Sequence, residues 1–392
     1  MTSLEHLGSV LAPTVAALPD DVRTPHEISA HSHEIAQLTS SHGPVDLIAK
    51  ALEGEKSLAG YDGKLHWFGG GSVRMTYQSI AVWLLARSRI TGTSKALGEL
   101  ATFVDATELR AFASIALDGV DFDSPVQLAE DVSIVPWAMF PETATKSYLT
   151  RGIFATGVRR PHAAIVHSVR IPKLLYHQDD KPEVPAVSFD TANDALLVLA
   201  LAGPVAPYAL ATWVDVPESV PSLGAAMMLS EATGTFHRTS LPPDAQQQLA
   251  PVWAAWRSLP SASQASLRVP LYRLVSAMRR RTTVDAAIDL GIAIESAFLS
   301  DVTGASGELK FRIQLRAARW LSEGATERAA VFALVGALYD ARSTAVHQGV
   351  LGPKVGKHDT GALLRDGYSV MARALSKLIL VGIPDWKLFV LQ

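Results

Sequence analysis

The stretch "VFALVGALYDARSTAVHQG" (residues 331–349) completes a long apolar pattern near the C-terminus of the chain. Four apolar residues recur at the spacing that buries one face of an α-helix, namely Val331, Leu334, Val335 and Leu338. The same spacing then reaches Ala341, Arg342, Ala345 and Val346. We therefore expect a helix over 326–347 with Arg342 on its inner or interface side, where a charged group needs a partner.

The end of this helix carries a histidine, His347, five positions after the arginine. Gly349 suits the residue just past a helix end, which places His347 in the last turn. Five residues rotate about 140° around a straight helix, so Arg342 and His347 do not share one face within one chain. Two interpretations remain open. In the first, the histidine interacts favourably with the helix dipole and the arginine pairs with Asp340 or Glu295. In the second, the two side chains form a functional site.

The surrounding sequence has helical periodicity almost to the C-terminus. The pattern predicts helices over 244–258, 263–280, 282–299, 307–322, 326–347 and 360–380, with a longer loop at 348–359. Gly291 interrupts the third of these helices. We expect residues 241–392 to form an all-α helical bundle with short connections.

Residues 1–240 have a different pattern of apolar residues, and we expect them to form an α+β region. The pattern is helical over 1–115, whereas 120–217 contains short apolar runs that suit strands: "VSIVPW", "AAIVHSVRI", "ALLVLALAG" and "YALATWVDV". The "WFGGGS" at 67–72 lacks the ending of a P-loop and the spacing of a dinucleotide fingerprint, so it predicts a flexible turn. Residues 229–248 are expected to link the two parts.

Composition limits the classes of protein that fit. The chain has 392 residues, 48% hydrophobic and 19% charged, which is ample for two globular domains. It has no cysteine, which excludes disulfides, thiol catalysis and Cys-ligated zinc. No apolar run of about 18 residues lacks charge, and the N-terminus has no basic region, so we expect no membrane span, no secretion signal and a cytoplasmic location.

Charge is distributed unevenly between the two parts. Residues 241–392 contain 18 Lys and Arg against 12 Asp and Glu, whereas residues 1–240 contain 17 against 26. An acidic part joined to a basic part favours different partners for each, and a polyanion suits the basic part. Ordinary variation between surfaces also explains an excess of this size.

The segments "AAIDLGIAIESAFLSDVTGASGELKFRIQLRAARWL" (286–321) and "ALYDARSTAVHQG" (337–349) together resemble the Apea-like branch of the HEPN superfamily. The resemblance covers roughly 245–383 and leaves the first 240 residues unexplained. It implies a HEPN-like helical bundle that forms a homodimer. In catalytically active members, an Arg-x4–6-His motif is a metal-independent ribonuclease centre.

Carried over by residue, this resemblance assigns the family's arginine to Arg342 and its histidine to His347. The polar residue that often follows the arginine is Ser343 here, which cannot titrate near neutral pH. Gln348 stands where the family has a glycine after the histidine. We expect Arg342, His347 and Ser343 to form the catalytic set, with histidine moving protons and arginine stabilising the charge that develops on the phosphate.

Further residues are expected to support RNA binding. Arg312, Arg316 and Arg319 follow helical spacing and form one basic line, which suits either a phosphate backbone or a solvated face. Glu295 would hold Arg342 or pair with Arg316. The remaining supporting residues are Asp340 and, in the loop after the motif, Lys354 and Lys357. His162 and His167 have no third ligand nearby in sequence, so we expect no metal site.

The sequence thus predicts a metal-independent endoribonuclease that needs no cofactor, with RNA as its partner. The family resemblance further implies a role in anti-phage defence or stress response, with residues 1–240 receiving an unknown trigger. The alternative is a non-catalytic HEPN module that binds RNA, nucleotide or a partner protein, and this is favoured by Ser343 and Gln348. A structural scaffold is a third interpretation.

Overall fold

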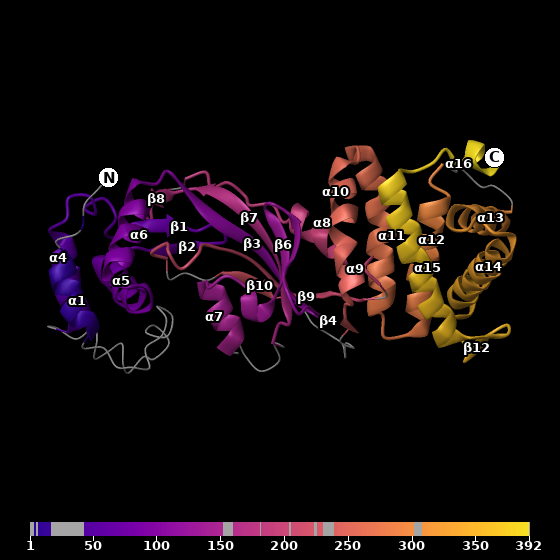
Figure 1. The fold of residues 1–392 in the computed structure, drawn as a ribbon, viewed down its shortest axis with the longest axis horizontal. Helices are drawn as coiled ribbons and strands as arrows, with labels where there is room; N and C mark the ends of the chain where they lie inside the picture. Colours follow the sequence, from indigo (N-terminus) through magenta and orange to yellow (C-terminus); the bar gives the residue numbers. More distant parts are fainter. Residues whose placement is uncertain are drawn as a thin grey trace.

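The computed structural model describes residues 4, 7–16, 43–151, 160–180, 182–203, 205–222, 226–229, 239–301 and 308–391. These residues form a mixed α+β protein (Figure 1). The first helices lie at one end of an elongated molecule, a sheet occupies the middle, and the C-terminal helices form the other end. The predicted order, an α+β part followed by helices, is confirmed at this level.

The N-terminal end contains helices α1 (Gly8–Ala16), α4 (Pro44–Glu53), α5 (Tyr77–Thr91) and α6 (Thr93–Asp105). Helix α5 starts at a capping box, in which Thr76 and Ser79 exchange side-chain and backbone hydrogen bonds. The prediction that 1–115 is mainly helical is incomplete. Strands β1 (Leu65–Trp67) and β2 (Ser72–Arg74) form a small antiparallel sheet with β8 (Leu174–Tyr176), and the first strand of the main sheet starts at Glu108.

The main sheet has six antiparallel strands in the order β10-β9-β3-β7-β6-β5. Their bounds are Met227–Leu229 for β10, Tyr208–Asp215 for β9, Glu108–Asp118 for β3, Ala163–Pro172 for β7, Val132–Pro136 for β6 and Val126–Ala129 for β5. Shorter elements border the sheet, namely β4 (Val120–Asp121), β11 (Thr239–Ser240), the 3-10 turn η2 (Trp137–Met139) and α7 (Ala144–Arg151). Three of the four predicted strand runs are therefore strands.

The fourth run, "ALLVLALAG" (195–203), is wrongly predicted as a strand. It lies mainly in helix α8 (Asp190–Leu199), whose buried side chains include Ala195, Val198 and Leu199. A short apolar run has no periodicity that separates a buried helix from a buried strand. Helix α8 packs between the sheet and the C-terminal helices, and these tertiary contacts stabilise the helical conformation.

The C-terminal end contains α9 (Pro243–Gln247), α10 (Leu249–Ser258), α11 (Ser261–Arg279), α12 (Thr283–Phe298), α13 (Leu309–Leu321), α14 (Ala325–Gln348), α15 (Thr360–Val381) and α16 (Trp386–Leu391). The predicted helices agree closely, except that 244–258 is split into α9 and α10 and that α16 was not expected. The predicted loop contains a hairpin of β12 (Lys354–Val355) and β13 (His358–Asp359).

The hydrophobic core continues across the expected boundary at residue 240. One cluster of buried residues joins the sheet, through Ile115 and Ile165, to the C-terminal helices. Asp194 of α8 fixes this junction, because it accepts hydrogen bonds from Trp256 at 3.1 Å and from Arg268 at 2.8 and 2.9 Å. Of the expected linker, 230–238 lies outside the described residues, whereas Thr239 pairs with β4. The division into two domains remains a prediction.

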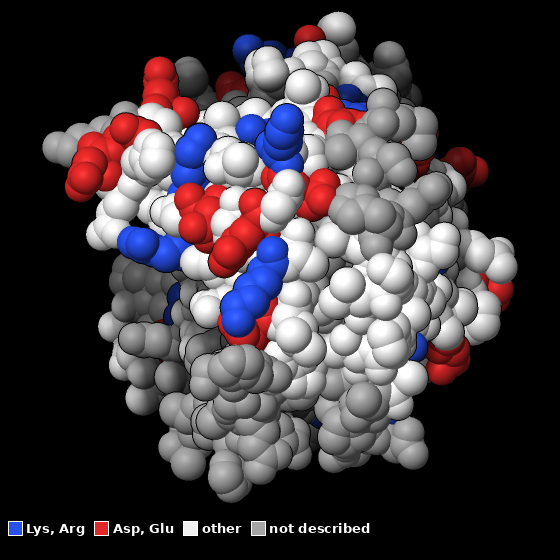
Figure 2. Space-filling model, turned by 90° about the vertical axis from the view of Figure 1, so that its left-hand side faces the viewer, with Lys and Arg blue, Asp and Glu red and all other residues white. Residues whose placement is uncertain are grey.

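The surface at the N-terminal end has mixed charge. Figure 2 shows Lys and Arg side chains standing among Asp and Glu side chains on this face. One ion pair here joins Lys50 Nζ to Asp46 of the same helix at 2.8 Å. The acidic excess of the N-terminal part is therefore not gathered into one patch on the described part of this face.

Helix α14 is long and apolar enough to cross a membrane, by length and composition alone. A core helix of a soluble protein meets the same test, so one such helix is only weak evidence for a membrane span. In this structure α14 packs against α12, α13 and α15 and buries Val335, Leu338 and Ala341. These contacts favour a core helix, and the absence of a membrane partner remains a prediction.

Candidate functional site at the end of helix α14

Helix α14 runs without interruption through the motif and ends where the sequence predicted. Gly349 adopts a left-handed conformation with φ 67°, and its N–H donates to Ala345 O at 3.0 Å. The predicted buried stripe holds for Val331, Val335, Leu338, Ala341 and Ala345. It does not reach the end of the helix, since the Val346 side chain is 47% exposed.

Arg342 lies against helix α12 at the position of Gly291. A Cβ atom added at Gly291 would stand 2.3 Å from Cγ and 2.7 Å from Cβ of Arg342. Real side chains do not approach this closely, so the glycine is required for the two helices to meet here. In the sequence Gly291 was only an interruption of a predicted helix. In the structure its missing side chain leaves the space in which Arg342 packs against α12.

The guanidinium of Arg342 has few partners. Within the described part of the chain, its Nη2 forms an ion pair with Glu295 Oε2 at 3.5 Å, a long distance for a charge-assisted hydrogen bond. Its Nε atom is buried and has no hydrogen-bond partner among the described residues. The side chain is 27% exposed. Arg342 is thus held in place by packing, and its side chain stays partly exposed beside a long ion pair.

His347 and Ser343 stand on different sides of α14 from this contact. His347 is exposed and Ser343 is partly exposed. The intact helical geometry keeps His347 about 140° around the axis from Arg342, as the spacing predicted. Within one chain the structure therefore does not bring the arginine and the histidine together on one face.

Asp340 does not pair with Arg342. Both of its carboxylate oxygens accept hydrogen bonds from Lys310 of α13, at 2.6 and 2.8 Å. Glu295, rather than Asp340, is the acid beside the arginine, so one of the two partners proposed from sequence is correct. The Asp340–Lys310 pair joins α13 to α14 two residues before Arg342.

Arg316 corrects the expectation of a basic line that binds phosphates. Its side chain is buried and donates to Phe298 O at 2.6 Å and to both oxygens of Asp301 at 2.6 and 3.0 Å. Burial would raise the pKa of Asp301, but the hydrogen bonds and charge of Arg316 lower it below its ordinary value. The Arg316 guanidinium also lies 5.6 Å from the centre of the Trp386 ring. Arg316 is a structural residue that binds the protein itself.

Arg319 also binds another segment of the protein, because its Nη1 donates a hydrogen bond to the Val390 carbonyl of helix α16. Arg312 is exposed on the same helix. The three arginines lie along one side of α13, but Arg316 and Arg319 form hydrogen bonds to other segments of the chain. The sequence could not show this, since Asp301 and Val390 come from other elements.

The hairpin after α14 presents Lys354 and Lys357 to solvent. The turn between its strands contains Gly356 at φ 58°, a conformation that favours glycine. Strand β12 contacts α14, so both lysines are carried on a short, ordered hairpin next to the motif. Among the described residues neither lysine forms an ion pair with Arg342, whose partner is Glu295, and their supporting role remains a prediction.

Metal ligands do not gather anywhere in the described part of the chain, where no group of three His, Cys, Asp or Glu residues could hold an ion. The two histidines of the predicted strand face separate acids. His162 Nδ1 lies 3.6 Å from Asp121 and His167 Nε2 lies 3.3 Å from Asp131.

Comparison with models of protein families, with curated proteins and with solved structures gave no match to this chain.

Proposed function

We propose that this protein is a metal-independent endoribonuclease of the HEPN type. The observation that carries the proposal is the state of Arg342, a partly exposed arginine that is fixed by packing and whose guanidinium makes a long ion pair with Glu295. A fixed forked cation with available donors suits a phosphate whose charge increases during the reaction. Arg316, on the preceding helix α13, provides the contrast, since its guanidinium donates to Asp301 and to the Phe298 carbonyl.

The proposed chemistry uses the 2′-hydroxyl of RNA as the nucleophile. His347 removes a proton from this hydroxyl or gives one to the leaving 5′-oxygen, and Arg342 stabilises the phosphorane between them. The products are a 2′,3′-cyclic phosphate and a free 5′-hydroxyl. Ser343 contributes a hydrogen bond only, because its hydroxyl does not titrate near neutral pH.

A symmetric dimer completes the proposed site. Arg342 and His347 project from different sides of α14, so one chain alone does not form an arginine–histidine pair. A two-fold axis beside this helix would bring the arginine of one copy toward the histidine of the other and would supply two histidines for the two proton transfers. The exposed apolar side chains of Val346 and Val350 at the same helix end suit such a contact.

The test uses purified full-length protein and a labelled mixed-sequence RNA in EDTA. We expect the wild type to leave 2′,3′-cyclic phosphate ends, and His347→Ala and Arg342→Ala to lose at least about a hundredfold in rate. His177→Ala and Arg373→Ala, exposed residues elsewhere, are matched controls that keep full activity. Unchanged cleavage by either motif variant refutes the proposed site, and light scattering checks that each variant keeps its oligomeric state.

A non-catalytic binding module is the second candidate. It is supported by Ser343, which cannot take part in proton transfer, and by Gln348, which stands where the family has a glycine. Under this function the wild type binds RNA, nucleotide or a partner protein without cutting RNA, and Arg342→Ala weakens that binding. Gel-shift and cleavage assays on the same samples separate the two functions.

The setting of the activity is part of the proposal. By resemblance, the protein acts in the bacterial cytoplasm in anti-phage defence or stress response. Its N-terminal part would receive the trigger, and the shared core at α8 provides the physical connection through which a trigger could act on the helical part.

A further inference from the structure

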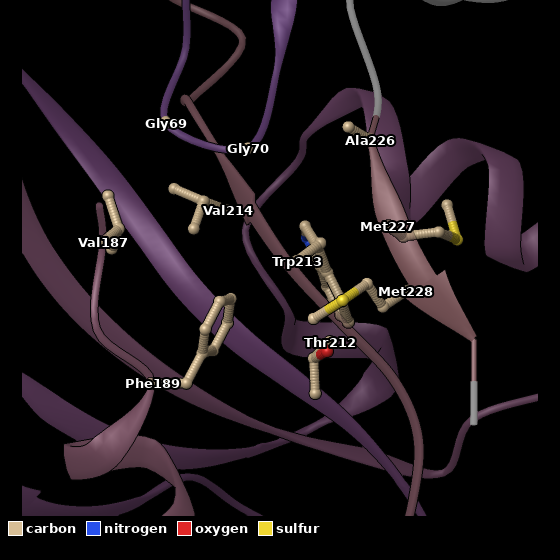
Figure 3. A pocket seen from close by; sticks show the side chains of 10 residues that line it. All are labelled: Gly69, Gly70, Val187, Phe189, Thr212, Trp213, Val214, Ala226, Met227 and Met228. Carbon is tan, nitrogen blue, oxygen red and sulfur yellow. The ribbon is translucent and has the colours of Figure 1, made fainter. Parts of the chain in front are cut away.

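A pocket of about 260 Å³ opens on the main sheet in the N-terminal part (Figure 3). The motif helix α14 lies in the C-terminal end of the molecule, away from this sheet (Figure 1). Ten residues line it, namely Gly69, Gly70, Val187, Phe189, Thr212, Trp213, Val214, Ala226, Met227 and Met228. They come from the β1–β2 turn, the segment before α8, strand β9 and the edge strand β10. Neither the proposed ribonuclease chemistry nor the sequence motifs use this pocket.

The turn with three glycines forms one wall of the pocket by close packing. A Cβ at Gly69 would stand 2.4 Å from Val214 Cγ1, and one at Gly70 would stand 2.9 Å from Val214 O. Gly69 also has a φ of 97°, which favours glycine. The sequence predicted a flexible turn here, but the structure shows a turn whose glycines let the backbone lie directly on β9.

The lining favours one chemical class of ligand. Its side chains are apolar, aromatic or thioether, with the Thr212 hydroxyl as a polar group, and no charged side chain is among them. Phe189 supplies an aromatic face, and Met228, 66% exposed at the mouth, supplies an adaptable thioether. A charged ligand would lose its hydration without gaining a counter-charge. The volume lies at the small end of ligand pockets, which suits one ring system.

We propose that this pocket binds a small, uncharged aromatic molecule and that binding is transmitted to the C-terminal helices. The occupant would lie between Phe189 and strand β9 under the glycine turn, with Met228 closing over it. Figure 3 shows Phe189, Thr212 and Met228 around the same space. This proposal does not depend on the ribonuclease activity.

Two walls of the pocket belong to elements that contact the helical part directly. Phe189 is the N-cap residue of α8, whose Asp194 holds Trp256 and Arg268. At its other end, β9 begins at Tyr208, whose ring lies 5.3 Å from the guanidinium of Arg279 on α11. Ordering Phe189 and β9 on a ligand therefore restrains two contacts with α10 and α11, which gives a physical basis for coupling.

Binding is tested on the full chain with 2-naphthol, a fluorescent single ring system that is uncharged at neutral pH. We expect saturable binding that weakens at least about fivefold in Phe189→Leu and in Met228→Ala, because each removes a contact with the ring. Val187→Trp should fill the pocket and abolish binding. Met139→Ala, which changes another exposed methionine that lies outside the pocket lining, is the control.

Equal probe binding by wild type and all three pocket variants overturns the proposal, as does equally tight binding of naphthalenesulfonate to the wild type. Coupling is measured separately by hydrogen exchange. We expect the bound probe to slow exchange in α10 and α11, and Val187→Trp to remove the response to added probe. Probe binding without any change in α10 and α11 overturns the coupling and leaves the binding site standing.

Discussion

Gly291 of α12 and Arg342 of α14 are in direct contact, with no room for a side chain at position 291. The missing side chain at 291 is what allows the Cβ and Cγ of Arg342 to reach the backbone of α12. The guanidinium is then left beside Glu295 and partly open to solvent. A residue of potential function is therefore positioned by a glycine that has no chemistry of its own.

Replacing Gly291 with alanine should destabilise the protein by about 1–3 kcal/mol, because the new Cβ overlaps Arg342. Gly98→Ala is the matched control, since it lies in helix α6 with nothing within 4 Å of its Cβ position. That change should instead stabilise by about 0.5–1 kcal/mol through helix propensity. Urea denaturation measures both, and equal effects of the two changes would contradict the close contact.

Arg316→Met should lower the free energy of unfolding by about 3 kcal/mol, because Asp301 and the Phe298 carbonyl lose their partner. Arg373→Met is the control, since Arg373 is 56% exposed in its pair with Glu327 and should cost less than about 1 kcal/mol. Thermal and urea unfolding report the difference. If Arg316→Met kept full stability and lost RNA binding, Arg316 would belong to an RNA site after all.

His66 should make the protein less stable in acid. It is fully buried, neither ring nitrogen has a partner among the described residues, and burial together with the charge of Lys173 lowers its pKa to about 4. The unfolded chain takes up a proton near pH 6.5, so this group's contribution is present above that pH and is lost as pH falls toward 4.

The variant His66→Leu removes this dependence and should gain roughly 3 kcal/mol over wild type between pH 8 and pH 4. Urea unfolding at several pH values measures the gain, and His177→Leu, at an exposed position, should show no such trend. A constant difference between His66→Leu and wild type across this range would argue against a buried neutral histidine.

Asp215 should act in the opposite direction. Burial raises its pKa to about 6, although the N–H groups of Thr145 and Val216 donate to it at 2.9 Å. The folded state holds this proton more tightly than the unfolded state, so the contribution is present below the ordinary pKa and is lost as pH rises through 6. Relative to Asp215→Asn, the wild type should lose about 3 kcal/mol between pH 4 and pH 7. Parallel pH profiles of the two proteins would refute this.

The sequence by itself determined the helices of the C-terminal part and the position of the motif within them. Periodicity and the glycine after the helix are local signals, so they located α14, its buried stripe and its end at Gly349. The angular separation of Arg342 and His347 also followed from helix geometry alone. The strands β6, β7 and β9 were predictable for the same reason.

Only the tertiary structure decided which polar groups pair and which stay available. Arg316 and Arg342 both lie on predicted helices next to apolar residues. The guanidinium of Arg316 donates hydrogen bonds to Asp301 and to the Phe298 carbonyl. The guanidinium of Arg342 forms a long ion pair with Glu295 and remains partly exposed. The helical state of 195–199 likewise depended on what packs against it. Partner choice is a property of segments that meet in space, and local spacing along one element does not contain it.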